Sequence, residues 1–237
     1  MLGNNIIALI VTLIICVLWL RIMDFFAHKK WIDSPLSRKI IHIGTGPIFV
    51  LCWPLFEYNN FYSRFFAASV PLLITIQFFL VGAGIIKDQA SVDSMSRTGD
   101  RKEILRGPLY YGIVFVLLTI LFWKDSLIGI IALMLMCGGD GMADIVGTRI
   151  RSTSIPWAKN KTLAGTISVF VGGWIFCVAI IFIYQVWGIM DISTQNLLLP
   201  VTAIAFIGAL VESLPFKDID NITVPLASIL LSFLVLR

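Results

Sequence analysis

The amino-acid sequence predicts an all-α, polytopic integral membrane protein with about eight transmembrane helices, seven being the alternative. The chain of 237 residues is 58% hydrophobic and only 14% charged, and its mean hydropathy is +0.93. Such a composition lies outside the range of soluble domains. Apolar stretches near the length that crosses a bilayer as a helix recur along the whole chain. Basic residues gather in alternate connections, which supports the same division into spans.

Each predicted helix is an apolar stretch bounded by polar or charged residues. The first is followed by Arg21 and lacks a small-residue cleavage pattern, so we interpret it as a retained span and not as a signal peptide. Gly107 and Pro108 suit the start of the fourth span, and Lys161-Thr162 leads into the sixth. The predicted spans are 5–23, 40–56, 64–86, 108–123, 125–146, 163–187, 197–214 and 222–236.

The connections are too short to form a soluble domain, the longest being 87–107. We therefore predict one transmembrane domain over 1–237, in which 1–36 forms a peripheral first helix and loop. The four cysteines lie in or beside apolar spans and none form C-x-x-C, so we interpret them as buried small hydrophobic residues.

Basic residues are divided unevenly between the two predicted surfaces. All of the 18 except Arg64, Lys124 and Arg237 fall in alternate connections, the last of which holds Lys217. By the positive-inside rule these connections are cytoplasmic and both termini lie outside. The lipid bilayer is one partner, and an anionic partner at the cytoplasmic surface is another, acidic head groups being the simplest choice. Nucleic acid is excluded because no basic soluble module with base-stacking aromatic residues is present.

Four polar clusters fall on this predicted cytoplasmic side. In the first, Arg38 and His42 are one helical turn apart at the entry to the second span. The second cluster is the loop 96–111, which is either an ordinary solvated segment or a phosphate clamp, because guanidinium groups bind phosphate oxygens as forks. Its basic residues are Arg97, Arg101, Lys102 and Arg106.

The third cluster places two carboxylates, Asp140 and Asp144, at the end of an apolar stretch, where an unpaired acid is costly. Their spacing would put both on one helical face, but Gly138, Gly139 and Gly141 make a break or a tight backbone approach equally plausible. Carboxylates bind a hard cation such as Mg2+, which bridges phosphates. Further along the chain, A-K-N-K-T-L-A-G-T supplies lysines and the exposed N–H groups of a helix start, which favour an anion.

A simple ion pair of Asp140 or Asp144 with Arg149 or Lys161 is the structural alternative for the third cluster. The fourth cluster, 211–225, has an acid near a span end followed by a polar turn. Its residues are Glu212, Asp218, Asp220 and Asn221. The aspartates and the asparagine are ordinary turn formers; alternatively, the cluster makes a second contribution to metal or nucleotide binding.

Common nucleotide-binding motifs are absent. Asn160 precedes Lys161 where a Walker A loop requires glycine, and G-x-G-x-x-G does not occur. Any nucleotide site is therefore of another type.

The ordered set of motifs resembles the phytol kinase and dolichol kinase family, which includes farnesol and geranylgeraniol kinases and is distantly related to phosphatidate cytidylyltransferases. The motifs are R-K-I-I-H-I-G-T-G-P, S-R-T-G-D-R-K-E-I-L-R-G-P-L-Y, G-D-G-M-A-D-I-V-G, N-K-T-L-A-G-T and D-N-I-T-V-P. They define a family-like catalytic region over 37–226. The short chain resembles the compact phytol kinase branch more than the longer dolichol kinases.

The resemblance implies phosphoryl transfer from a nucleoside triphosphate, typically CTP, to the hydroxyl of a membrane-dissolved isoprenoid alcohol. It implies Mg2+ or nucleotide contacts for Asp140 and Asp144, to which the fourth cluster adds Glu212 as a metal ligand. His42 or one aspartate would orient the acceptor hydroxyl or take its proton. The expected nucleotide and phosphate contacts are Arg38, Lys39, Arg97, Arg101, Lys102, Gly139, Gly141, Lys159, Lys161, Thr162, Gly165, Thr166, Asp220 and Asn221.

We therefore expect a CTP-dependent kinase of a long-chain prenyl alcohol such as phytol or geranylgeraniol. The enzyme alternatives are a cytidylyltransferase that acts on a lipid phosphate and a diacylglycerol kinase. A cation-coupled transporter is the alternative of another class, but its acids should lie near the membrane midplane and not at one surface.

Overall fold

A computed structural model describes residues 3–215 and 219–236 and divides the chain into two compact units, Met1–Leu121 and Phe122–Arg237. Three residues used in the sequence analysis, Lys217, Asp218 and Arg237, lie outside the described residues.

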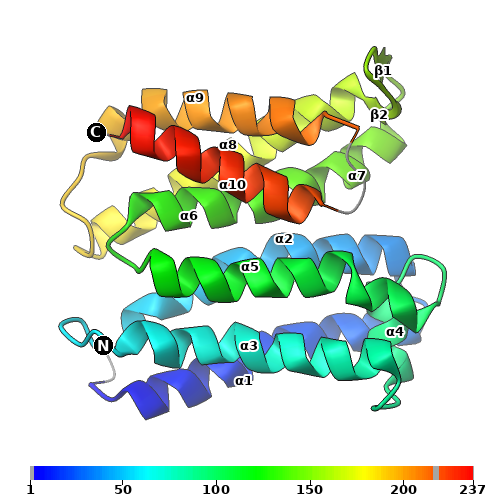
Figure 1. The fold of residues 1–237 in the computed structure, drawn as a ribbon, viewed down its shortest axis with the longest axis horizontal. Coiled ribbons are helices and arrows are strands. Elements are labelled where there is room, and N and C mark those ends of the chain that lie inside the picture. The colour runs from blue at the N-terminus through cyan, green and yellow to red at the C-terminus, as the bar shows by residue number, and fades with distance from the viewer. Residues whose placement is uncertain (1–2, 216–218, 237) are drawn as a thin grey trace. The chain divides into compact units, whose positions relative to one another are not determined.

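The described part of the first unit consists of helices and the loops that join them. Two long antiparallel helices, α3 and α5, pack side by side, and α1 packs against α2 and α3 (Figure 1). The elements are α1 (Asn5–His28), α2 (Ser34–Cys52), η1 (Trp53–Leu55), α3 (Ser63–Ala83), α4 (Gln89–Met95), η2 (Arg101–Leu105) and α5 (Gly107–Leu121).

Local signals explain where these helices begin and end. The side chain of Asp33 accepts a hydrogen bond from the Leu36 N–H and caps α2, whose first turn also contains Pro35. This cap starts the helix at Ser34, six residues before the predicted start at 40, so Arg38 and His42 are both helical. Gly84 ends α3 with a left-handed φ of 78°, which glycine adopts without steric cost.

A small apolar core holds the short helix α4 against the long ones. Its buried side chains come from α1, α2, α3, α4 and η2. Because α4 has only seven residues, its position depends on this packing and on polar contacts described below. The core residues are Leu20, Met23, Ile41, Phe78, Val81, Val92, Met95 and Ile104.

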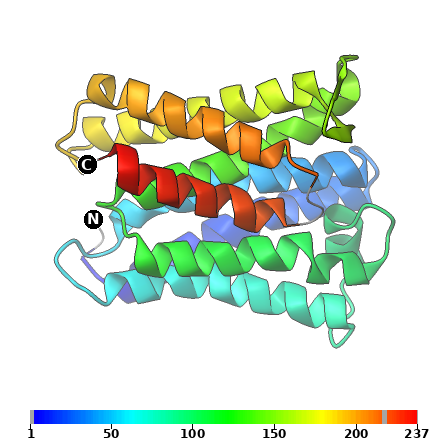
Figure 2. The ribbon, with the colours of Figure 1, turned by 45° about the horizontal axis from the view of Figure 1, so that its top comes forward.

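The second unit consists of helices and one short hairpin. Helix α8 packs along α9, and α10 lies against α9 and α6 (Figure 2). The hairpin pairs β1 with β2 antiparallel around a turn at Pro156-Trp157 and was not predicted from the sequence. The elements are α6 (Leu127–Met134), η3 (Leu135–Asp140), α7 (Gly141–Arg149), β1 (Ser154–Ile155), β2 (Ala158–Thr162), α8 (Leu163–Val186), α9 (Thr194–Glu212) and α10 (Asp220–Val235).

The all-α, polytopic membrane class predicted from the sequence is confirmed. All eight predicted spans correspond to helical segments, and six of those among the described residues are long and apolar enough to cross a membrane. Helix α2 is not one of the six, and its first half carries Arg38, Lys39 and His42; α10, with 16 residues, is shorter. The six are Asn5–His28, Ser63–Ala83, Arg101–Leu121, Leu127–Arg149, Leu163–Val186 and Thr194–Glu212.

Candidate functional site

The fifth predicted span is one continuous helix whose middle segment, η3, is π-helical. A π-helical turn is rare and is found frequently at functional sites. Asp140 is the last residue of this segment, and only 7% of its surface is exposed. Of the two alternatives for the glycine-rich sequence, a break does not occur, and Gly141 continues the helix with an ordinary φ of −59°.

A tight backbone approach does occur, between η3 and α8. A Cβ atom on Gly172 would lie 2.7 Å from the carbonyl oxygen of Gly138, and one on Gly139 would lie 3.1 Å from Val169 Cγ1. Glycine is therefore required at this crossing, because a side chain would push the helices apart. The close contact fixes the end of η3, and with it Asp140.

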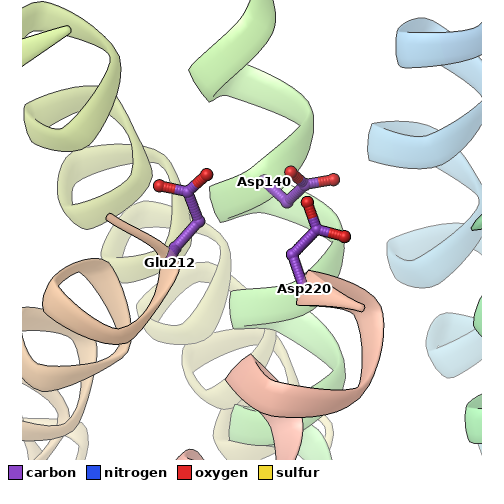
Figure 3. Close-up of side chains that lie close together, drawn as sticks. All are labelled: Asp140, Glu212 and Asp220. Atoms are coloured by element: carbon purple, nitrogen blue, oxygen red, sulfur yellow. The ribbon is translucent and has the colours of Figure 1, made fainter. Parts of the chain in front are cut away.

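Three carboxylates from different helices meet at this point. Glu212 is the last residue of α9 and Asp220 is the first residue of α10. One oxygen atom of each, together with one of Asp140, lies within 4.8 Å of the others (Figure 3). The turn between α9 and α10 thus brings two acids of the fourth sequence cluster to the first acid of the third.

The donor set of this carboxylate cluster, Asp140, Glu212 and Asp220, fits a hard divalent cation. Carboxylate oxygens are the ligands that Mg2+ prefers, and the cluster contains neither sulfur nor imidazole. Carboxylates this close disfavour each other's ionised form unless a positive charge lies among them. Asp140 and Glu212 are buried, which increases that repulsion.

One positive charge is supplied by Lys161. Its Nζ lies 2.7 Å from Oε1 of Glu212 and also donates to the backbone carbonyl of Glu212. The hairpin places it there, because β2 runs directly into α8 and Trp157 at the turn donates to Ser213 Oγ at 3.2 Å. The sequence had suggested an ion pair of Lys161 with Asp140 or Asp144, and the pair with Glu212 was not predicted.

The predicted exposed N–H groups at the start of α8 are already used. Leu163 N–H donates to the carbonyl of Thr153, Ala164 N–H to Ser152 Oγ, and Gly165 N–H to the Oγ1 of the capping Thr162. These N–H groups therefore have acceptors within the chain, because the segment before β1 folds back over the helix start, which the sequence did not reveal. The phosphate contacts expected at this helix end stay predictions.

The other predicted residues of the second unit surround these elements. Asp144 lies one turn after Asp140 in α7 and is exposed, outside the carboxylate cluster. Lys159 is exposed on β2, two residues before Lys161. The Thr166 hydroxyl is buried without a hydrogen-bond partner among the described residues. Asn221 is buried beside Asp220 in the first turn of α10.

In the first unit, α2 carries Arg38, Lys39 and His42. Lys39 is buried, with 8% of its surface exposed. The ring of Tyr111 lies 4.3 Å from that of His42, and the Tyr111 hydroxyl donates to the His42 carbonyl at 2.7 Å. Tyr111 was part of the second sequence cluster, but its contact with the first cluster could not be read from the sequence.

The basic loop before α5 is ordered by Glu103, which was not predicted as a functional residue from the sequence. Glu103 accepts hydrogen bonds from the backbone N–H of Arg97 and from the N–H and hydroxyl of Thr98. Arg101 donates to the carbonyl of Gly82 at 3.2 Å, and Asp100 caps the turn that contains Lys102. The loop is thus a defined structure, and the Arg101 guanidinium already binds the end of α3.

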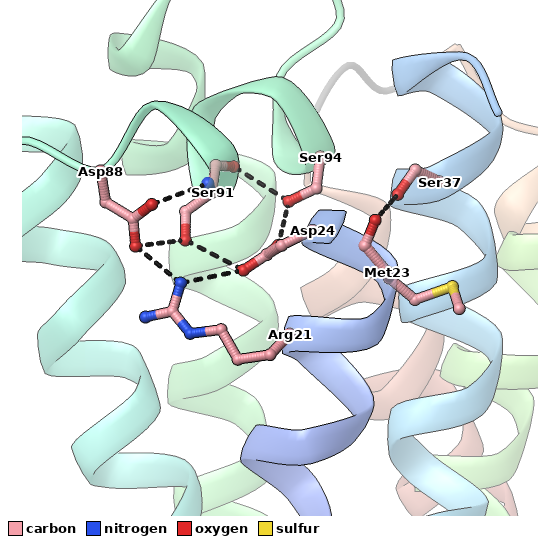
Figure 4. A network of polar contacts seen from close by, with 7 residues as sticks. All are labelled: Arg21, Met23, Asp24, Ser37, Asp88, Ser91 and Ser94. Atoms are coloured by element: carbon pink, nitrogen blue, oxygen red, sulfur yellow. Dashed lines mark hydrogen bonds and ion pairs between the residues drawn. The ribbon is translucent and has the colours of Figure 1, made fainter. Parts of the chain in front are cut away.

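A polar network joins α1 to α4 in the first unit (Figure 4). Arg21 contacts Asp88 at 2.8 Å and Asp24 at 3.1 Å, while Ser91 and Ser94 donate to Asp24. Burial tends to raise the pKa of Asp88, but hydrogen bonds from Arg21 and Ser91 outweigh it and hold that pKa below its ordinary value. This network was missed because its members are distant in sequence.

Comparisons with known proteins give consistent relatives. The chain is 39% identical over 217 residues to a probable chloroplastic phytol kinase of Triticum aestivum, covering 91% of this chain and 72% of the relative. It is 40% identical over 213 residues to the chloroplastic phytol kinase 1 of Arabidopsis thaliana, covering 89% and 70%. It is 41% identical over 205 residues to the chloroplastic farnesol kinase of Arabidopsis thaliana, covering 86% and 66%.

No family model matches the chain, and no solved structure matches it.

Proposed function

Because the chain belongs to the phytol kinase family, and is therefore a phosphotransferase with an alcohol acceptor, we propose that it transfers the γ-phosphoryl group of CTP to a long-chain isoprenoid alcohol such as phytol or geranylgeraniol. The observation that carries this proposal is the carboxylate cluster at one end of a set of apolar helices. A membrane-dissolved alcohol would present its hydroxyl at the interface, where a water-soluble nucleotide also arrives.

In this proposal Asp140, Glu212 and Asp220 hold Mg2+. When bound, the ion would offset the negative charge of the donor phosphates, including the charge that develops during transfer. Asp144 lies one turn away and is exposed, so it is proposed to contact the nucleotide or the hydration shell of the ion.

The phosphate contacts of the second unit are proposed to come from side chains, since the first N–H groups of α8 are occupied. Lys159 is exposed on β2, two residues before Lys161. Thr166 offers its buried hydroxyl, and Asn221 its amide. Thr162 and Gly165 are proposed to maintain the helix start.

In the first unit, the family resemblance implies that Arg38 and Lys39 line the nucleotide site. Arg97, Arg101 and Lys102 are proposed as phosphate contacts because basic side chains bind phosphate oxygens. These assignments stay predictions. His42 stays a candidate for orienting the acceptor hydroxyl, alongside one of the aspartates.

The sidedness of the site is proposed from charge. The catalytic motifs lie in connections that carry most basic residues, so they would face the cytoplasm, with both termini outside.

The test is an assay of purified protein in detergent with Mg2+, γ-labelled CTP or ATP, and a panel of phytol, geranylgeraniol, farnesol, dolichol and diacylglycerol. We expect label from CTP to enter a prenyl alcohol with release of CDP. Release of pyrophosphate would instead indicate cytidylyl transfer, and label in diacylglycerol alone would contradict the proposed acceptor.

Substitution of the cluster tests the metal assignment. Asp140→Asn, Glu212→Gln and Asp220→Asn should each lower kcat about 100-fold or more, because each removes a ligand of an ion that supplies several kcal/mol. Asp191→Asn is the matched control, since Asp191 is exposed between α8 and α9 at the far end of both helices, and it should retain activity. Full activity of folded Asp140→Asn and Glu212→Gln would overturn the metal assignment.

A further inference from the structure

Lys161 has two contacts with the same residue, and both lie at the end of α9. Its Nζ binds the side-chain Oε1 of Glu212 and the main-chain carbonyl of Glu212. The second contact also satisfies one of the carbonyls that a helix leaves without a partner at its C-terminus, where a cation is favoured. Lys161 is therefore fixed to the helix end as well as to the carboxylate.

The same carboxylate belongs to the cluster. An oxygen of Glu212 lies within 4.8 Å of an oxygen of Asp140 and of an oxygen of Asp220, and Lys161 binds Oε1 of Glu212. Without a cation nearby, repulsion from Asp140 and Asp220 would favour a Glu212 rotamer that points away from them. An ammonium that holds the carboxylate in place opposes this movement.

We propose that Lys161 is a positioning residue of the metal site, which holds Glu212 in the orientation that binds Mg2+, and that it is not a phosphate ligand. This inference rests on the proposed function of the cluster. It reassigns a residue that the family resemblance gave to phosphate, and it makes the hairpin part of the metal site, because β2 carries Lys161.

The first experiment measures Mn2+ binding by electron paramagnetic resonance on the purified protein in detergent, without nucleotide. Lys161→Met should weaken Mn2+ binding about 10- to 100-fold, the usual effect of removing a residue that orients a metal ligand. Lys161→Arg, which can still pair with Glu212, should recover most of the affinity. Lys159→Met on the same strand is the matched control for this readout and should leave Mn2+ affinity unchanged.

A double-mutant cycle tests whether Lys161 acts through Glu212. After Glu212→Gln, adding Lys161→Met should cause little further loss of Mn2+ affinity, because the oriented carboxylate is already gone. Additive losses would overturn the inference. A thermal-unfolding measurement identifies any variant that fails to fold. If Lys161→Met fails to fold, the Mn2+ affinities of Lys161→Arg and Glu212→Gln are compared with that of wild type instead.

Kinetics separate this role from phosphate binding. A positioning role predicts that Lys161→Met raises the Mg2+ concentration for half-maximal activity while the KM for CTP at saturating Mg2+ changes little. A raised KM for CTP with unchanged Mn2+ affinity would show a phosphate contact and overturn the inference. Stronger Mn2+ binding in Lys161→Met would also overturn it, by showing that Lys161 competes with the metal.

These outcomes are distinct from failure of the proposed function. Wild-type protein that binds no Mn2+ would remove the metal site itself, and wild-type protein that phosphorylates no prenyl alcohol would remove the kinase. Normal kinase activity with normal Mn2+ binding in Lys161→Met would remove only the role of Lys161.

Discussion

Individual charged residues of this chain were recognised from the sequence more reliably than their partners were. Asp140 and Glu212 were both predicted as metal ligands, and both belong to the carboxylate cluster. Lys161 was predicted to approach a phosphate or an aspartate of the third cluster, yet it contacts Glu212, 51 residues away. Spacing along a helix predicts neighbours within one element, but contacts between elements depend on how those elements pack.

At the same scale, the Arg21–Asp88 pair makes stability depend on pH. The pKa of Asp88 is lower in the folded protein than its ordinary value of 3.8, so the pair stabilises the fold above that pH and loses its effect as the pH falls through the folded-state pKa. Asp88→Asn should cost about 1 kcal/mol at pH 7, as expected for a partly exposed pair. The thermal midpoint in detergent should be lower than that of wild type at pH 7, and the difference should disappear at an acidic pH below the folded-state pKa of Asp88.

The control for this prediction is Asp191→Asn, which removes an exposed carboxylate and should change the midpoint at neither pH. An equal difference between Asp88→Asn and wild type at both pH values would show that the effect does not come from the ionised pair.

At the scale of elements, helices were predicted well and the irregular segments were not. The apolar stretches marked every long helix, although caps such as Asp33 moved their ends by several residues. The π-helical geometry of η3 and the hairpin before α8 were both missed. A π-helical turn has no distinct sequence pattern, and a hairpin this short is held by its contacts with α9 as much as by its own residues.

The crossing of η3 and α8 gives a prediction at this scale. Gly172→Ala would place a Cβ 2.7 Å from the Gly138 carbonyl oxygen and 2.9 Å from Met142 Cγ, so the helices must separate. We expect a loss of about 1–3 kcal/mol in stability, as for other overpacked interiors. We also expect weaker Mn2+ binding, because Asp140 lies at the end of η3.

Gly208→Ala in α9 is the matched control for the crossing. A Cβ there would meet its nearest neighbour, Leu135 Cδ1, at 3.6 Å, an ordinary contact. This variant should be as stable as wild type or slightly more so, since alanine favours helix. Thermal unfolding and Mn2+ titration of both variants check the pair, and equal behaviour would contradict a packing role for Gly172.

At the scale of the whole molecule, the chain has the composition and helices of a multi-pass membrane protein. The distribution of basic residues predicts an orientation in which the catalytic motifs face the cytoplasm. Asn59 lies in a connection with few basic residues, and Thr153 lies in one with many; both are exposed. The described cysteines Cys16, Cys52, Cys137 and Cys177 are all buried, so new cysteines can be labelled against a low background.

Single Asn59→Cys and Thr153→Cys variants test this orientation in intact bacterial cells with a membrane-impermeant maleimide. We expect labelling of the cysteine at 59 without permeabilisation and of the cysteine at 153 only after it. The reverse pattern would invert the proposed topology, and labelling of both in intact cells would contradict the division into spans.

The sequence by itself determined the membrane class, the helices and the types of residue that could bind a metal or a phosphate. These follow from composition, from the length of apolar stretches and from the cost of charges near them, all of which act locally along the chain. Only the tertiary structure decided that Asp220 completes the cluster, that Lys161 holds Glu212 and that the α8 N–H groups are occupied. Each of these depends on contacts between segments distant in sequence, which packing creates and local patterns do not encode.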